Sequence, residues 1–190
     1  MGKVVLIVGP HGVGKTSLID YARKKNEVAV YEGFKISNQN YDLNDNNDFL
    51  AYQQQYLKKA SMQSRKIHNS NRNGFVLRSI EECSFYYFLR EESDLMNEYY
   101  KIVRVKEYMG ADIIIYLDAS YEILQLRCRN DQKRDKRKTD LWYQEIYSKY
   151  DKYWKNYPDI VILDTSKETI PDLYKKIKEI CDERPICFKK

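Results

Sequence analysis

The chain has 190 residues, the length of one ordinary α/β domain, so we expect residues 1–190 to share a single hydrophobic core. Lys and Arg total 33 against 28 for Asp and Glu, a mild positive excess that suits anionic ligands without requiring nucleic acid. Four cysteines without a Cys-x-x-Cys pair, together with two histidines, exclude the usual zinc patterns and are typical of reduced thiols. The first strand has no leader before it and no apolar run is long enough to span a membrane, so the sequence predicts a soluble cytoplasmic protein.

Five short apolar runs rich in β-branched residues predict strands that are covered on both faces. They lie at residues 4–8, 28–31, 75–77, 113–117 and 160–163. Helical patterns follow them at about residues 15–25, 47–68, 80–109, 119–130, 139–155 and 168–183. Alternating strands and helices with right-handed crossovers predict a parallel sheet, and ligands of such sheets bind beyond the carboxyl ends of the strands.

Residues 9–16, Gly-Pro-His-Gly-Val-Gly-Lys-Thr, match the phosphate-binding loop pattern G-x-x-x-x-G-K-[ST] at every specified position. The glycines let backbone N–H groups turn toward phosphate oxygens, and the helix that follows adds the positive end of its dipole. We expect Lys15 to reach the β and γ phosphates of a nucleotide and the Thr16 hydroxyl to ligate Mg²⁺. The candidate nucleotide-binding residues here are Gly9, His11, Gly12, Val13, Gly14, Lys15 and Thr16.

A basic segment follows the fourth predicted strand. Between residues 127 and 138 stand seven basic side chains, Arg127, Arg129, Lys133, Arg134, Lys136, Arg137 and Lys138, against Asp131 and Asp135. A charge run of this kind is usually a solvated helix end, but its place after the fourth strand of a phosphate-loop protein favours a lid that closes over phosphates.

The end of the second predicted strand bears on the acceptor of a phosphoryl group. Glu32 stands there, and a carboxylate base favours a hydroxyl acceptor. A phosphate acceptor needs cations instead, and residues 28–34 supply none before Lys35. The alternative interpretation of Glu32 is a solvated side chain at a strand end.

Taken together, these features resemble the deoxyribonucleoside kinase family, within the wider group that includes thymidylate kinases. The resemblance covers nearly the whole chain. Its parts are the loop at residues 9–16, Glu32, Gln54-Gln55-Tyr56, Leu77-Arg78-Ser79, residues 116–120, the basic segment, and the Tyr- and Trp-containing helix at residues 143–154. The resemblance implies a three-layer α/β P-loop kinase fold, with a five-stranded parallel sheet, helices on both faces and a basic lid.

The resemblance also implies roles for individual residues. Glu32 would remove the proton from a nucleoside 5′-hydroxyl, and Arg78 would bridge the acceptor and the phosphates. Gln54 would pair with the base, with Gln53 and Gln55 as the neighbouring registers. Tyr41 would contact the sugar 3′-hydroxyl, and Asp135 stands where the family's sugar-binding acid begins. Arg127 fits the leading lid arginine and is a catalytic candidate together with Lys15. Lys133 or Arg134 stands where a second lid base is expected, and Arg129 is a further candidate for the nucleotide.

The chain departs from the family at several of these positions. Leu77 replaces an acid associated with Mg²⁺, and Glu81 or Glu82 could substitute through water. A glycine rather than a proline follows Glu32. Ser61 and Cys83 stand where members that read cytosine or purines carry an Arg and an Asp, so a pyrimidine acceptor is slightly favoured unless Arg65 restores a charge in another register.

The sequence therefore predicts an ATP- and Mg²⁺-dependent kinase that phosphorylates a deoxyribonucleoside 5′-hydroxyl in nucleotide salvage. The first alternative is a nucleoside monophosphate kinase resembling thymidylate kinase, in which Lys35 and Arg78 would hold an acceptor phosphate. The second is a nucleotide-binding module with little turnover, in which Leu77 marks the loss of metal geometry. The expected partners are small molecules, and the resemblance implies a homodimer through the helices of residues 80–109.

Overall fold

The computed structural model describes residues 1–34, 36, 41–130 and 140–184. The elements follow the order β1 (Val4–Val8), α1 (Lys15–Lys25), β2 (Ala29–Tyr31), α2 (Asn46–His68), β3 (Gly74–Val76), α3 (Ile80–Phe88), α4 (Ser93–Val105), β4 (Ile113–Asp118), α5 (Tyr121–Asn130), α6 (Asp140–Trp154), β5 (Val161–Asp164) and α7 (Ile170–Glu183).

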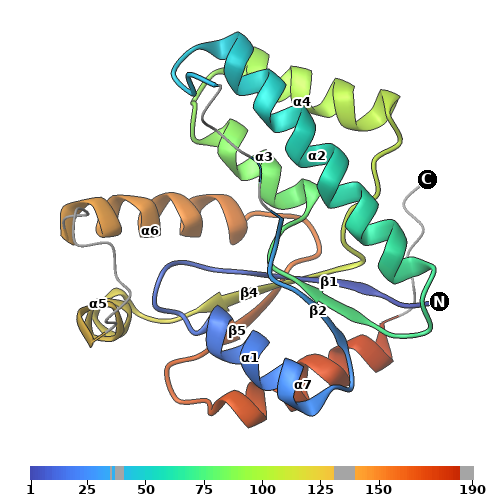
Figure 1. Ribbon diagram of the computed structural model, residues 1–190. Helices are drawn as coiled ribbons and strands as arrows, with labels where there is room; N and C mark the ends of the chain where they lie inside the picture. The colour runs from blue at the N-terminus through green and yellow to red at the C-terminus, as the bar shows by residue number, and fades with distance from the viewer. Residues whose placement is uncertain (35, 37–40, 131–139, 185–190) are drawn as a thin grey trace.

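The five strands form one parallel sheet in the order β2-β3-β1-β4-β5. Helices α1 and α7 cover one face, while α3 and α6 cover the other, and α2 and α4 pack beyond α3 (Figure 1). The predicted fold class, a three-layer α/β arrangement around a five-stranded parallel sheet, is confirmed.

The central strand shows why its sequence is apolar without alternation. Val5 and Ile7 pack on the side of α1 and α7, whereas Val4, Leu6 and Val8 pack on the side of α3 and α6. Because successive side chains of a strand point to opposite faces, a strand covered on both faces needs an apolar residue at every position. All five residues of β1 are buried.

The span 80–109, predicted as helical, consists of two helices. Helix α3 ends at Phe88 and α4 begins at Ser93. Glu91 between them has a φ of 57°, a left-handed conformation that breaks the helical hydrogen-bond series. The chain therefore reverses, and α4 packs beside α2 and α3 through an aromatic cluster that includes Phe49, Tyr87 and Tyr99.

The chain ends are tied together at the amino ends of the strands. The ammonium group of Lys3, just before β1, donates to the backbone carbonyls of Cys181 and Arg184 at the end of α7. The loops after β1, β2, β3 and β4 lie at the other end of the sheet. In the part of the chain that the structure describes, we find no helix with the length and apolarity needed to cross a membrane.

Candidate active site

The phosphate-binding loop follows β1 directly. Gly9, Gly12 and Gly14 have φ values of 147°, 82° and 103°, which L side chains rarely adopt. Gly9 also passes so close to β4 that an added Cβ would lie 2.4 Å from the carbonyl oxygen of Leu117. Gly14 caps α1 without a side-chain hydrogen bond, so the first N–H groups of the helix are available to an anion.

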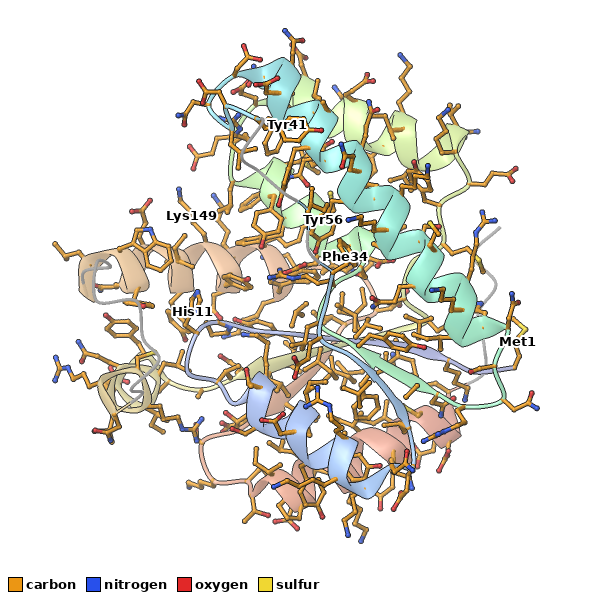
Figure 2. All side chains as sticks on the ribbon, viewed as in Figure 1. Met1, His11, Phe34, Tyr41, Tyr56 and Lys149 are labelled. Carbon is orange, nitrogen blue, oxygen red and sulfur yellow. The ribbon has the colours of Figure 1, made fainter. Side chains whose placement is uncertain are left out.

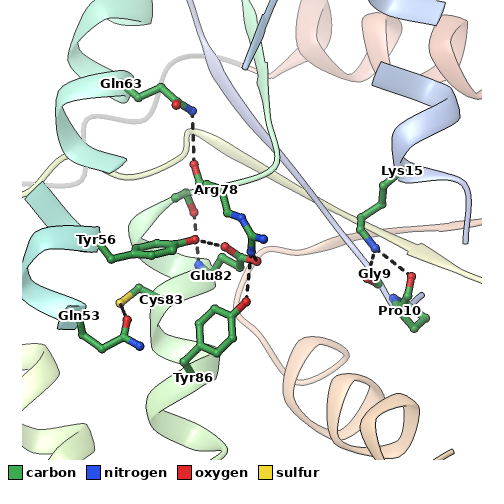
Figure 3. A network of polar contacts seen from close by, with 11 residues as sticks. Gly9, Pro10, Lys15, Gln53, Tyr56, Gln63, Arg78, Glu82, Cys83 and Tyr86 are labelled. Atoms are coloured by element: carbon green, nitrogen blue, oxygen red, sulfur yellow. Dashed lines mark hydrogen bonds and ion pairs between the residues drawn. The ribbon is translucent and has the colours of Figure 1, made fainter. Parts of the chain in front are cut away.

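Lys15 lies across this loop. Its ammonium group donates to the carbonyl oxygens of Gly9 at 2.6 Å and of Pro10 at 2.9 Å (Figure 3). Burial lowers the pKa of Lys15 to about 8; the charge of Glu82 acts in the opposite direction, and that of Arg78 adds to the lowering. Thr16 follows in the first turn with an exposed side chain. The Lys15 ammonium group is thus held against carbonyl oxygens of the loop, and from this position it can turn to phosphate oxygens.

Helices α5 and α6 lie on either side of residues 131–139 in the chain, and both contact the loop. An added Cβ at Gly12 would lie 2.8 Å from the Cys128 sulfur and 2.9 Å from the Leu124 carbonyl oxygen on α5. The His11 ring lies 5.9 Å from the Trp142 ring and 5.6 Å from the Tyr143 ring on α6, measured between centroids. Val13 is buried in the core beneath the loop.

The basic side chains of the predicted lid are only partly within the described residues. Arg127 donates to the Thr165 hydroxyl at 3.0 Å and to the Thr165 carbonyl at 2.7 Å, so it anchors the chain after β5 rather than pointing freely toward the loop. Arg129 is exposed near the end of α5. Lys133, Arg134 and Asp135 lie outside the described residues.

A cavity of about 370 Å³ opens between α2, α3 and the chain that follows β2. This volume lies within the range of small-molecule pockets, roughly 300–1,000 Å³. One wall places the ring of Phe34 against that of Tyr56, 5.0 Å apart (Figure 2). At the rim, the guanidinium of Arg90 stacks 4.5 Å from the centre of Phe49. The lining residues are Phe34, Ile36, Leu43, Phe49, Tyr52, Gln53, Tyr56, Arg78, Tyr86 and Arg90.

The glutamine in this cavity is Gln53, whereas Gln54 points to solvent. Gln53 is buried, and its side-chain oxygen accepts a hydrogen bond from the Cys83 thiol at 3.0 Å. Of the three glutamines considered for a base contact, the structure thus places Gln53, and not Gln54, in the cavity wall. The helical pattern carried the signal, because Gln53 lies one turn after the apolar Phe49 and one turn before Leu57, on the buried face of α2.

Three other residues considered in the sequence have clear positions. Tyr41 accepts a hydrogen bond from Gln55 and packs 5.8 Å from the ring of Tyr52, at the edge of the cavity. Cys83 is fully buried behind Gln53, and burial raises the pKa of its thiol well above the ordinary value. Arg65 is exposed and donates to the carbonyl of Glu107, so it restores no positive charge to the cavity.

A polar cluster lies between the cavity and the phosphate-binding loop (Figure 3). Arg78 forms an ion pair with Glu82 and donates to the Tyr86 hydroxyl at 3.1 Å, while the Tyr56 hydroxyl donates to the other oxygen of Glu82. Burial raises the pKa of Glu82, and Arg78, Tyr56 and Lys15 oppose that rise. Burial alone would lower the pKa of Arg78, but the charge of Glu82 holds it above its usual value.

Glu32 is placed differently from Glu82. Its side chain is half exposed and pairs with Arg23 of α1 at 2.6 Å. Gly33 follows with a φ of 146°, and an added Cβ there would lie 3.0 Å from the stem of Arg78. The strand end thus brings Glu32 to the outer side of the site, and the chain then turns inward against Arg78.

The described residues contain no group of three or more His, Cys, Asp or Glu side chains suited to a metal ion. Asp118, at the end of β4, pairs with Lys155 at 2.9 Å and accepts the Ala119 N–H. A hydroxyl at the start of α1 is a hard oxygen donor that fits Mg²⁺ held largely by water and phosphate, the usual coordination of that ion. Thr16 therefore stays the predicted protein ligand.

The strand order 2-3-1-4-5, the loop after β1 and the helices on both faces define the fold of the P-loop kinases. Among solved structures, the deoxyadenosine kinase of M. mycoides with dCMP and dCDP bound is similar over 95% of this chain and 100% of that one, at 18% identity and a TM-score of 0.63. The same enzyme with dATP aligns at 17% identity and a TM-score of 0.63, covering 94% and 99%. Thymidylate kinase from Candida albicans aligns at 14% identity and a TM-score of 0.60, covering 95% and 91%. No protein-family model and no curated protein sequence matches the chain.

Proposed function

We propose that this chain is an ATP- and Mg²⁺-dependent kinase that transfers a phosphoryl group to the 5′-hydroxyl of a deoxyribonucleoside. The observation that carries the proposal is an aromatic-lined cavity of about 370 Å³ whose wall includes Arg78, and Arg78 and its partner Glu82 both influence Lys15 of the phosphate-binding loop. The proposal treats residues 1–190 as one kinase domain that acts in the cytoplasm in nucleotide salvage.

The cavity suits a nucleoside better than a phosphate alone. Five aromatic rings line it, and such rings bind a nucleobase by stacking; they belong to Phe34, Phe49, Tyr52, Tyr56 and Tyr86. Gln53 is the side chain proposed to pair with the base edge, and Tyr41 is proposed for the sugar. A sugar hydroxyl would then point toward the polar cluster and the loop.

A pyrimidine remains the slightly favoured acceptor. Ser61 accepts the backbone N–H of Met109 at 2.8 Å, and Cys83 donates to Gln53, so neither position presents a charge to the cavity. The M. mycoides deoxyadenosine kinase shares the fold at 18% identity. The base preference proposed here therefore rests on the residues of this chain and not on that similarity.

The phosphoryl transfer itself needs positioning and charge neutralisation more than covalent chemistry. We assign Lys15 and the backbone N–H groups of the loop to the β and γ phosphates, and Arg78 to the transferred oxygens. Arg127 anchors the chain after β5, and Arg129, Lys133 and Arg134 are proposed as the further phosphate contacts. When bound through Thr16, Mg²⁺ would supply neutralisation of phosphate charge.

One observation favours a second candidate function. Arg78 and Arg90 both line the cavity, and two guanidinium groups are suited to an acceptor phosphate. A nucleoside monophosphate kinase would use them in this way. Arg90, however, donates to the Leu43 carbonyl at 2.6 Å and stacks on Phe49, which gives it a structural role at the rim.

The test is a turnover assay with ATP, Mg²⁺ and a panel of deoxyribonucleosides and their monophosphates. We expect labelled monophosphate from thymidine or deoxycytidine, and Lys15→Ala should reduce its formation at least a hundredfold because the phosphates lose their ammonium group. Product from monophosphates alone would support the second function. A protein that binds ATP but labels no acceptor would contradict both kinases and support a binding module.

A further inference from the structure

Glu82 is the most deeply buried carboxylate of the candidate site. Its side chain is 6% exposed, compared with 51% for Glu32. Glu32 is held by Arg23 on the outer surface, whereas Glu82 contacts Arg78 and Tyr56, both of which line the acceptor cavity. Glu32 therefore belongs to the outer surface of the protein, whereas Glu82 belongs to the wall of the acceptor cavity.

The surroundings of Glu82 come from four elements. Tyr56 belongs to α2, Arg78 to the turn before α3, and Tyr86 and Cys83 to α3 itself. Lys15 of α1 and Tyr150 of α6 also lie within electrostatic reach of the Glu82 carboxylate. A group that contacts the cavity wall on one side and influences Lys15 on the other lies where an acceptor must meet the γ-phosphate.

We propose that Glu82 is the catalytic base that takes the proton of the acceptor hydroxyl, in place of Glu32. The inference rests on the proposed nucleoside kinase function. The hydroxyl proton passes to a carboxylate oxygen of Glu82, and the hydroxyl oxygen forms a bond to the γ-phosphorus. The bond between that phosphorus and the β–γ bridging oxygen breaks, leaving ADP and a nucleoside monophosphate.

The contacts of Glu82 leave room for this role. An ionised carboxylate has about four lone-pair sites, and Tyr56 and Arg78 use one on each oxygen. The Arg78 side chain is 39% exposed, so it can turn toward the phosphates when a nucleotide binds. That movement would free an oxygen of Glu82 for the acceptor while Tyr56 keeps the carboxylate in place.

The charged and titratable groups facing Glu82 are consistent with a base. Burial raises its pKa, while Arg78, Tyr56 and Lys15 keep the ionised form accessible. A carboxylate whose pKa is raised above its ordinary value is a stronger proton acceptor than a solvated one. Tyr86, Tyr150 and Cys83 stay neutral, because burial raises the pKa of each.

The first test compares Glu82→Gln with Glu98→Gln, a position on α4 whose side chain is 39% exposed and which provides the control. We expect Glu82→Gln to lower kcat by about 10² to 10⁴, the usual contribution of a general base, with the Kd of ADP unchanged within about threefold. Glu98→Gln should retain the turnover of the parent protein. Thermal unfolding of both variants checks that each is folded.

The second test leaves the carboxylate in place and removes its hydrogen-bond donor. The Tyr56 hydroxyl lowers the pKa of Glu82. In the pH profile of kcat/KM, Tyr56→Phe should therefore move the acidic limb to higher pH by about half to one unit. A base at Glu32 predicts no shift, because Tyr56 does not contact it. This measurement holds even if Glu82→Gln does not fold.

The outcomes separate the two proposals. Turnover of a nucleoside by the parent protein, with an unchanged rate in Glu82→Gln or an unmoved acidic limb in Tyr56→Phe, overturns the role of Glu82 and leaves the kinase intact. If the parent protein phosphorylates no nucleoside, the proposed function and the role of Glu82 are overturned together. A lowered kcat and a shifted limb support both.

Discussion

The pKa of Lys15 depends strongly on the surroundings of its side chain. In the free loop its ammonium group is buried among carbonyl oxygens, and burial lowers the pKa to about 8 from 10.5 in a solvated chain. The unfolded chain therefore holds this proton more tightly than the folded protein does. The cost to stability is fully present below about pH 8 and is relieved as the pH rises toward 10.5.

This pKa predicts proton uptake when a nucleotide binds. Phosphate groups favour the charged ammonium, so ATP binding at about pH 8.5 should raise the pKa of Lys15 and draw a proton from the buffer. Calorimetric titrations in two buffers with different ionisation enthalpies measure the number of protons taken up. Lys15→Arg should bind without uptake, since arginine is already charged. Heats that are equal in both buffers for the parent protein would contradict the prediction.

The sequence specifies some site residues more completely than others. The loop at residues 9–16 could be predicted in full, because its function depends on backbone conformation within one contiguous segment. Gln54 was preferred to Gln53, although the spacing of Phe49 and Leu57 places Gln53 on the buried face of α2. The environment of Glu82 could not be read from the chain, since it arises only when α2, α3 and the loop come together.

At the scale of elements, the first turn of α3 determines where Glu82 lies. Ser79 caps this helix, and its buried hydroxyl accepts the backbone N–H of Glu82 at 3.3 Å. Thr169 caps α7 in the same way, accepting the N–H of Asp172 at 3.3 Å. The two caps are chemically alike, but only the first belongs to a turn that contributes to the candidate site.

This pair gives a matched prediction. Ser79→Ala and Thr169→Ala should each lower the free energy of unfolding by about 1 kcal/mol, because each leaves a helix N–H without its acceptor. Only Ser79→Ala should also lower kcat, by about tenfold, since the Glu82 carboxylate loses its fixed position. Urea unfolding and steady-state kinetics measure the two effects. Equal kcat values for both variants would show that the α3 cap is only structural.

Element boundaries were predictable where the local signal was strong. The strand at residues 4–8 was predicted with its observed bounds, and the helix at 15–25 likewise, because each is bounded by the loop glycines or by a left-handed residue at Asn26. The break between α3 and α4 was not predicted. No glycine or proline marks it; Glu91 adopts a positive φ there, and α4 packs back on α2 and α3.

At the scale of the whole molecule, the loop after β1 connects both flanks of the basic segment to the sheet. Helix α5 contacts it at Gly12 and α6 contacts it at His11. The sequence predicted that this segment serves the phosphates, but the contacts themselves could not be predicted. They join residues more than a hundred positions apart and depend on how α5 and α6 pack over β4.

The arrangement predicts an optical signal for nucleotide binding. The chain has two tryptophans; Trp154 is fully buried in the core, and Trp142 lies partly exposed beside His11. Phosphates bound at the loop change the field at the His11 ring, so the emission of Trp142 should change on titration with ATP. Trp142→Phe should abolish the change while binding persists in calorimetry. A change that survives this substitution would place the responding group elsewhere.

The bonds from Lys3 to the end of α7 have a practical consequence for experiments with this protein. Met1 and the end of α7 lie at the edge of the sheet opposite the loop that follows β1 (Figure 1). An affinity tag or a surface linker joined ahead of Met1 therefore leaves the loop that follows β1 facing the solvent. Immobilised protein should capture small ligands from a flowing sample without obstruction from its own attachment.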